Sequence, residues 1–289
     1  MKKSKLNPIV EKEVKNKTIL ITGGAGSIGS ALVKRLLEYP IKTVRVLDID
    51  EYSLFLLKRS VNDSRIRLLL GSVLDKERIE LAGNNVDIII HTAAVKNIEI
   101  SEFNPIETIE TNISGIVNLI KMTIRNKPKK FLNISTDKAA DPTTLYGTTK
   151  QLSERLTSWA GAHILSTKFA SVRLGNVFET KGNVFEIWHE ESKNNLPLSI
   201  TDPLMKRYYF HINDGVEFIL KCIPIINRGE ILVPKMPMYS MKDLANQISK
   251  KHKIIGLRQG EKMNEVMITQ DELKHATQKK DMWIIKQYS

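Results

Sequence analysis

The sequence has a single cysteine, no long hydrophobic run and no metal-ligand spacing. Cys222, alone among 289 residues, excludes an intrachain disulfide and is typical of a protein kept in the reducing cytoplasm. No apolar run approaches the roughly 18 residues that a membrane-spanning helix needs. The charged stretch 1–17 lacks the apolar centre of a signal peptide. The six histidines show no metal-ligand pattern. We therefore expect a cytoplasmic protein with no metal and no membrane partner.

The net charge of +12 raises the alternative of nucleic-acid binding, which predicts an affinity that falls steeply with salt. The lysines, however, occur as short scattered pairs instead of one stripe interleaved with aromatic residues. This distribution favours a solvated basic surface, whose field also attracts a small anionic substrate. We therefore expect no nucleic-acid partner.

Short apolar runs alternate with helical patterns over the first two thirds of the chain. Strands are predicted at 17–22, 44–47, 67–70, 86–91, 131–135 and 171–174, with helices near 30–39, 52–60, 76–81, 106–125 and 145–159. Such alternation predicts an α/β fold, a Rossmann-type doubly wound parallel sheet with helices on both faces. The alternation of strand and helix patterns becomes irregular after residue 175. We predict an N-terminal arm outside the fold (1–16), a cofactor-binding domain with the catalytic residues (17–175) and a smaller C-terminal lobe, mainly for substrate (176–289).

Glycine is concentrated in a turn, Gly23–Gly29, between the first predicted strand and the first long helix. Glycines at 23, 26 and 29 permit a tight turn and a close approach of the backbone to a diphosphate, which the helix N-terminus attracts. Ser27 and Ile28 belong to the same turn. Asp48 ends the next strand, where a carboxylate accepts both ribose hydroxyls of NAD and repels the 2′-phosphate of NADP. The pattern therefore predicts bound NAD, with NADP left open.

The stretch 131–150 carries the predicted chemistry. Tyr146 and Lys150 are four residues apart in a helical segment, so the phenol and the ammonium share one face. A nearby cation favours the phenolate and lowers the tyrosine pKa from about 10, which makes a general base for a hydroxyl proton. Thr136, Asp137 and Lys138 precede this helix at the end of a strand and add a hydroxyl, a carboxyl and an amine. The combination predicts an active site.

Several motifs resemble those of extended short-chain dehydrogenases/reductases, within them the polysaccharide-biosynthesis group of nucleotide-sugar 4,6-dehydratases. They are TGGAGSIG (22–29), HTAAVKNIEISEFNP (91–105), STDKAADPTTLYGTTK (135–150), VRLGNVFETKGNV (172–184) and GLRQGEKMNE (256–265). The resemblance covers nearly the whole chain from residue 17. It implies a dehydratase that acts on a UDP-sugar, UDP-N-acetylglucosamine above all. The tyrosine at 146 is typical of the short relatives that invert C5.

The resemblance also implies a role for each matching residue. Asp137 and Lys138 match the acid and the base of dehydration, and Thr136 matches the hydroxyl that holds the sugar O4. Further matches are Ala93 at the cofactor, Asn112 in a structural and proton-relay position, Lys96 on the substrate side, and Asn176, Arg258 and Glu261 at the nucleotide diphosphate. Departures such as Asn97, Glu99, Leu174, Lys181 and Lys206 lie mostly on the substrate side, so the particular sugar stays open.

The implied reaction needs opposite protonation states at two neighbouring residues. Asp137 must hold a proton to protonate the leaving 6-hydroxyl, and Lys138 must be neutral to remove the proton from C5. We expect burial under the substrate lobe to raise the pKa of the carboxyl and to lower that of the amine.

Two alternatives use the same fold. A UDP-sugar 4-epimerase would employ Tyr146 and NAD but not Asp137 and Lys138, and a non-catalytic NAD-binding sensor would need none of these residues for chemistry.

The helices predicted near 106–125 and 145–159 would form a four-helix dimer seam in this superfamily. We therefore expect a homo-oligomer.

Overall fold

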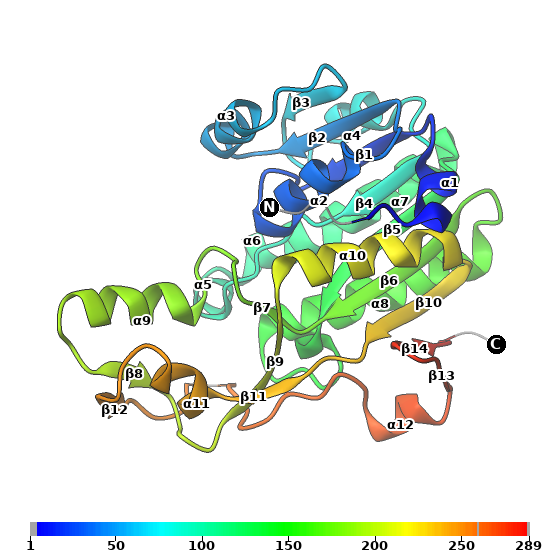
Figure 1. Ribbon diagram of the computed structural model, residues 1–289. Coiled ribbons are helices and arrows are strands. Elements are labelled where there is room, and N and C mark those ends of the chain that lie inside the picture. Colours follow the sequence, from blue (N-terminus) through cyan, green and yellow to red (C-terminus); the bar gives the residue numbers. More distant parts are fainter. Residues whose placement is uncertain (1–4, 259, 288–289) are drawn as a thin grey trace.

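A twisted nine-stranded sheet forms the centre of the protein (Figure 1). The computed structural model describes residues 5–258 and 260–287. The strand order is β13-β14-β10-β6-β5-β4-β1-β2-β3, and β10 to β3 run parallel while β13 and β14 are antiparallel. The strands are β1 (Thr18–Thr22), β2 (Thr43–Asp48), β3 (Ile66–Leu70), β4 (Ile88–His91), β5 (Lys130–Thr136), β6 (Lys168–Leu174), β10 (Arg228–Pro234), β13 (Ala276–Gln278) and β14 (Met282–Ile285).

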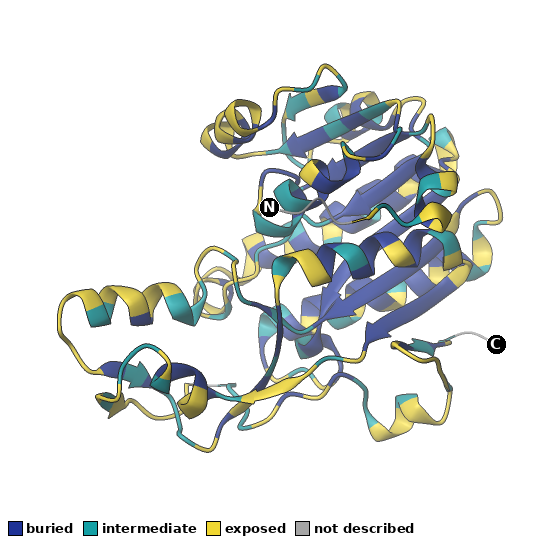
Figure 2. Ribbon diagram, in the orientation of Figure 1, coloured by how far each residue is buried: buried dark blue, intermediate teal, exposed yellow. Residues whose placement is uncertain are grey.

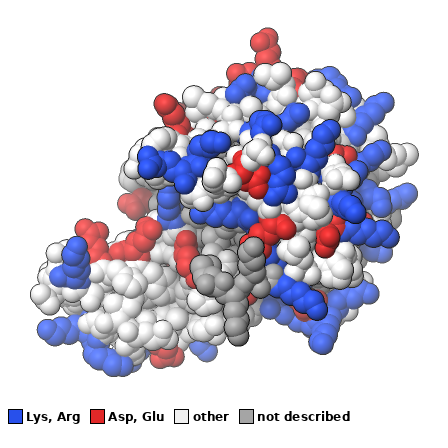
Figure 3. Space-filling model, turned by 45° about the horizontal axis from the view of Figure 1, so that its top comes forward, with Lys and Arg blue, Asp and Glu red and all other residues white. Residues whose placement is uncertain are grey.

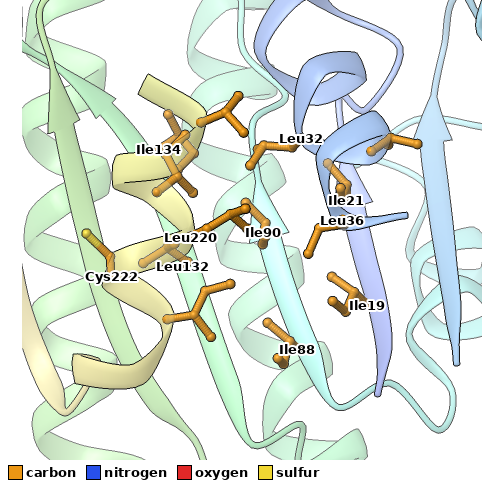
Figure 4. Close-up of a cluster of buried hydrophobic side chains, with 14 of the residues drawn as sticks. Ile19, Ile21, Leu32, Leu36, Ile88, Ile90, Leu132, Ile134, Leu220 and Cys222 are labelled. Atoms are coloured by element: carbon orange, nitrogen blue, oxygen red, sulfur yellow. The ribbon is translucent and has the colours of Figure 1, made fainter. Parts of the chain in front are cut away.

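Helices cover both faces of this sheet. On one face lie α1 (Pro8–Val14), α2 (Ser27–Leu36), α3 (Glu51–Ser60) and α10 (Ile212–Cys222); on the other lie α4 (Lys76–Gly83), α7 (Gly115–Asn126) and α8 (Leu145–His163). The central strands are buried throughout, as parallel strands between two helical layers must be (Figure 2). Leu32, Leu36 and Leu220 pack over Ile19 and Ile90 (Figure 4). The predicted fold class is confirmed.

Helix α1 is part of the domain. Val10 and Val14, four residues apart, are 1% and 0% exposed and belong to the same apolar cluster as α2 and α10. The Lys130 ammonium donates to Glu13 Oε2 at 2.6 Å and so ties the helix to β5. The expected arm outside the fold is therefore wrong for residues 8–14, because one apolar stripe of a two-turn helix is enough to dock it. Residues 1–4 lie outside the described part of the chain.

The C-terminal third is divided between a small lobe and the main sheet. The lobe contains β7 (Asn176–Val177), α9 (Val184–Lys193), β8 (Leu198–Ile200), β9 (Lys206–Phe210), β11 (Met238–Ser240), α11 (Met241–Asn246) and β12 (His252–Ile254). Its strands form two small sheets around a cluster that includes Trp188 and Tyr209. The chain returns to the main sheet as β10, and again as β13 and β14 after the short helix α12 (Gln270–Leu273). Among the described residues, no helix has both the length and the apolar character needed to cross a bilayer.

Candidate active site

A cleft of about 670 Å³ runs between the carboxyl ends of the parallel strands and the lobe. It lies where the strand order reverses between β1 and β4, the place at which open α/β sheets bind ligands. It is lined by all of the predicted cofactor and substrate residues and by four of the five predicted catalytic ones: Gly23, Gly26, Ser27, Ile28, Gly29, Asp48, Ala93, Lys96, Thr136, Lys138, Tyr146, Lys150, Asn176, Arg258 and Glu261. Asp137 lies directly beneath the lining and is 1% exposed.

The glycine turn packs against the end of β4. Gly23 has φ +67°, and a Cβ there would stand 2.5 Å from the backbone nitrogen of Ala93, so a larger residue would push the two loops apart. The turn leads directly into α2, whose first N–H groups and positive dipole end face the cleft. This backbone cradle fits the diphosphate of a dinucleotide.

Asp48 stands beside the same turn. Its Oδ2 accepts the Ala25 N–H at 2.9 Å and its Oδ1 accepts the Asp50 N–H at 3.1 Å. These bonds fix the carboxylate at the end of β2 and leave further acceptor positions for ribose hydroxyls. These carboxylate acceptors therefore fit the hydroxyls of an adenosine ribose without a 2′-phosphate.

Helix α8 brings the tyrosine to the strand end that carries Asp137. Thr144 caps this helix by accepting the Gly147 N–H at 3.1 Å. A Cβ at Gly147 would stand 2.6 Å from the carbonyl oxygen of Lys138, so the glycine is what lets α8 touch the turn η2 (Asp137–Ala139). The two halves of the predicted catalytic group therefore meet.

Asp137 is hydrogen-bonded on only one side. Its Oδ1 accepts from the Thr136 hydroxyl at 2.9 Å and from the Lys138 ammonium at 3.0 Å. Its Oδ2 is buried, and no described residue donates to it. A buried carboxylate oxygen without a partner is costly, and a ligand hydroxyl would satisfy it.

The pKa values of Lys138 and Tyr146 differ from the expectation. Burial alone would lower the pKa of Lys138, but the carboxylates of Asp137 and Glu265 outweigh it and raise that pKa. Burial raises the pKa of Tyr146, and the charge of Lys138 offsets only part of this rise. The expected lowering of both pKa values is therefore wrong, because the Asp137 carboxylate lies 3.0 Å from the lysine ammonium and the protein surrounds much of the tyrosine side chain.

Lys150 lies one turn below Tyr146 and is 4% exposed. Burial lowers its pKa to about 8, and the carboxylate of Glu154, one turn further along α8, opposes the shift. Glu154 itself is held by Arg173 through two hydrogen bonds of 3.0 and 2.7 Å, and Arg173 also binds Glu272 of α12. This largely buried ion triad connects α8, β6 and α12.

Asn112 joins two loops of the site. It lies in a π-helical turn, η1 (Glu110–Ser114), and its amide accepts from the Val95 N–H at 2.8 Å and donates to the Val95 carbonyl at 3.0 Å. It also donates to the Thr149 hydroxyl at 3.0 Å. Asn112 thereby fixes the loop after β4 against α8, the structural position expected of it.

The predicted substrate residues are all at the cleft but are engaged with protein atoms. Lys96 donates to the Lys181 carbonyl at 2.7 Å, and Asn176 donates to the Tyr208 carbonyl at 3.1 Å. Glu261 accepts the N–H of Arg258, whose side chain is exposed at the rim. Through its hydrogen bond, Lys96 fastens Lys181 of the lobe, whose N–H also donates to the Ser27 hydroxyl in the glycine turn.

Two cleft residues, Arg207 and Glu265, were not singled out by sequence, and His91, which the sequence indicates as a packing residue at the end of a strand, lies buried behind the cleft. His91 is buried, its Nδ1 lies 2.7 Å from the Thr22 hydroxyl, and burial followed by the charge of Lys150 lowers its pKa to about 3. Arg207 and Glu265 line the cleft from the lobe. The motif GLRQGEKMNE contains Glu265, but nothing in its pattern distinguishes this carboxylate from the exposed ones beside it.

Charge on the surface is mixed. On the face seen in Figure 3, Lys and Arg side chains stand in separate groups with Asp and Glu between them. The basic excess therefore does not gather into one stripe on that face.

The chain is similar to a known family and to several named proteins. Residues 19–287 match the family described as polysaccharide biosynthesis protein. A UDP-N-acetylglucosamine 4,6-dehydratase (inverting) of Campylobacter jejuni is 40% identical over 264 residues, which cover 89% of this chain and 78% of the relative. A UDP-glucose 4-epimerase of Rickettsia bellii is 34% identical over 273 residues, 90% of this chain and 80% of the relative.

The solved structure of Pen from Bacillus thuringiensis superimposes with a TM-score of 0.90 at 36% identity, covering 94% of this chain and 88% of that one. Because the family match extends over nearly the whole chain and includes both the glycine turn and the helix of Tyr146 and Lys150, this protein belongs to the polysaccharide biosynthesis family of extended short-chain dehydrogenases/reductases.

Proposed function

We propose that this protein is a nucleotide-sugar 4,6-dehydratase that converts UDP-N-acetylglucosamine to a UDP-4-keto-6-deoxy-N-acetylhexosamine with inversion at C5. The observation that carries the proposal is the unpartnered Oδ2 of Asp137, buried at the floor of the cleft beside Lys138. A dehydratase needs an acid at the leaving 6-hydroxyl and a base at C5, and this pair supplies both. An epimerase needs neither.

The hydrogen bond between the pair explains how both protonation states arise together. Lys138 is charged because the carboxylates of Asp137 and Glu265 outweigh the effect of burial and raise its pKa. A bound sugar would remove the remaining water, and burial penalises two charges more than two neutral groups. Transfer of one proton across the 3.0 Å hydrogen bond then gives a neutral amine and a carboxylic acid. The pair thus becomes base and acid without a proton from solvent.

Tyr146 would accept the proton of the 4-hydroxyl, and Thr136 would hold the same oxygen. The glycine turn and Asp48 would hold NAD, which would supply the hydride acceptor for C4 and the hydride donor for C6 and so would be regenerated in each cycle. The 4-ketone acidifies the hydrogen at C5. Lys138 then removes that proton while Asp137 protonates O6, which departs as water and leaves a C5–C6 double bond.

The lobe provides the side of the cleft where the nucleotide would lie. Arg258 is exposed at the rim and offers a planar fork for a diphosphate. Asn176 and Glu261 lie on the same side. The net charge of +12 would attract a doubly charged nucleotide sugar.

The test is a proton NMR time course of the purified protein with UDP-N-acetylglucosamine in D₂O. We expect a new C6 methyl signal, deuterium at C5 and ring couplings that report an inverted C5. Unchanged substrate, with NAD still retained by the protein, would contradict the proposal for this sugar.

The UDP-sugar 4-epimerase remains the second candidate because a relative at 34% identity carries that name. It would use Tyr146 and the cofactor alone. Its product in the same experiment would be a galacto-configured sugar with an intact 6-hydroxymethyl group and no methyl signal.

A further inference from the structure

Glu265 is a buried carboxylate that the mechanism above does not use. It is 6% exposed and lines the cleft. Although the residue as a whole is buried, its carboxylate oxygens are not among the buried polar atoms that lack a partner, so they are open to the cleft. No hydrogen bond from the described residues reaches them, which leaves the carboxylate free to exchange a proton with a ligand in the cleft.

The backbone that carries Glu265 is held firmly. Asn264 forms a bridge to Lys206 at the start of β9, and the Lys206 N–H donates to the Met263 carbonyl. The buried Arg207 guanidinium donates to the carbonyls of Met263 and Lys262 at 2.9 and 2.7 Å. Glu265 therefore follows a backbone segment that is hydrogen-bonded to β9, and it does not stand on a free loop.

The segment that carries Glu265 lies across the cleft from the turn with Asp137 and Lys138. Lys138 projects from the end of β5 in the main domain, whereas Glu265 stands beside β9 in the lobe, and both line the same cleft. The carboxylate of Glu265 helps to raise the pKa of Lys138, and the charges of Lys138 and Asp137 act on Tyr209 of β9. Two proton-carrying groups thus approach the cleft from different elements.

Inversion at C5 is served by such an arrangement. For a ring that keeps its position, one group removes the C5 proton, and another returns a proton to the opposite face. Asp137 and Lys138 are adjacent in one turn and bonded to each other, so they serve one side. A donor on a separate segment would serve the other side.

We infer that Glu265 is a further catalytic residue, the acid that protonates C5 from the lobe side; this inference rests on the proposed dehydratase function. Lys138, once it has taken the C5 proton, passes a proton to the Glu265 carboxylate. When hydride from the cofactor would reach C6, the electron pair of the C5–C6 double bond would take that proton from Glu265. Tyr146 holds the 4-hydroxyl proton and returns it, through water, to Asp137. Each group is then back in its starting state.

The experiment compares the wild type, Glu265→Gln and Glu265→Asp, each carrying its cofactor, with UDP-N-acetylglucosamine in D₂O. The control is Glu190→Gln, an exposed glutamate of α9 away from the cleft. Methyl formation and C5 configuration are followed by proton NMR, and transient reduced cofactor by absorbance. Thermal denaturation and UDP binding show that each variant is folded.

For Glu265→Gln we expect inverted product to form at least about 100-fold more slowly, the usual range for loss of a general acid. Residual product should keep the C5 configuration of the substrate, because only Lys138 can return the proton. Glu265→Asp should recover part of the inversion, and Glu190→Gln should match the wild type.

Inverted product formed by Glu265→Gln at the wild-type rate would overturn the inference. A wild-type methyl product that keeps the C5 configuration of the substrate would also overturn it, while the dehydratase proposal would stand. Only the lack of any methyl product from the wild type would count against the proposed function itself.

Discussion

The Lys138 ammonium lies 3.0 Å from Oδ1 of Asp137, while Oδ2 of the same carboxylate is buried without a donor among the described residues. One oxygen is therefore occupied by the neighbouring ammonium, and under the proposed function the other would act on the leaving 6-hydroxyl.

Asp137→Asn should stop the loss of water but leave oxidation at C4 partly intact. The amide keeps the size of the carboxyl and can still fill the floor of the cleft, but it has no proton to give to O6. We expect methyl formation to fall by at least about 100-fold, while reduced cofactor still appears on mixing with substrate. Asp214→Asn, an exposed change on α10, is the control. Dehydration by Asp137→Asn at the normal rate would refute its assignment as the acid.

The pH profile of the enzyme should reflect Lys150. Its pKa in the substrate-free protein is lowered to about 8, so the ammonium is lost as the pH rises through that value. Since kcat/KM reports the free enzyme, we expect it to fall about tenfold per pH unit above this point. Lys150→Arg keeps its charge at these pH values and should lose this alkaline limb, even if its activity is lower throughout. A limb that persists in the arginine variant would assign it to another group.

His91 should make the protein less stable in acid. Its pKa is about 3 in the folded state and 6.5 in its unperturbed form, so between these pH values the unfolded chain binds a proton that the native state does not. The stabilisation is present in full above pH 6.5 and is lost as the pH falls toward 3, by as much as about 5 kcal/mol.

Urea unfolding at a series of pH values tests this assignment. His91→Gln retains a polar group for Thr22 and does not titrate, so its free energy of unfolding should depend less steeply on pH between 6 and 4. His163→Gln, an exposed substitution, should keep the wild-type slope. Equal slopes for all three proteins would show that His91 does not control acid stability.

Arg173→Met should destabilise the fold by about 3 to 5 kcal/mol, because Glu154 would be left charged and buried without its partner. The matched control is Arg125→Met, which breaks the surface ion pair with Glu80 and should cost no more than about 1 kcal/mol. Urea unfolding of both variants measures the difference. Similar losses for the two would mean that the buried triad contributes little.

Homo-oligomer formation through α8 also stays a prediction. Leu152 and Trp159 of this helix are each 44% exposed. Phe103 and Ile106, which precede this helix in the chain, are 79% and 67% exposed. Burial of these side chains against a second copy would remove them from water. Sedimentation of Leu152→Lys/Trp159→Lys should show a smaller species than the wild type. A wild type that sediments as a monomer would contradict this seam.

Much of the fold follows from local patterns. Runs such as 17–22 and 131–135 are short, apolar and β-branched, and the structure places β1 and β5 there, so their periodicity and length were sufficient to assign them. The helix predicted at 106–125 is instead α6 (Pro105–Ile109), a π-helical turn and α7, because the extra residue around Asn112 is stabilised by its bonds to Val95 and not by any local signal.

The sequence by itself determined the fold class, the glycine turn and the composition of the catalytic group, since each depends on residues close together in the chain. Only the tertiary structure decided the direction of the pKa shifts of Lys138 and Tyr146, the docking of α1 and the place of Glu265 in the same cleft as Lys138. These depend on burial and on contacts between distant segments, here more than 100 residues apart for Lys138 and Glu265. A single sequence carries no local pattern for such contacts.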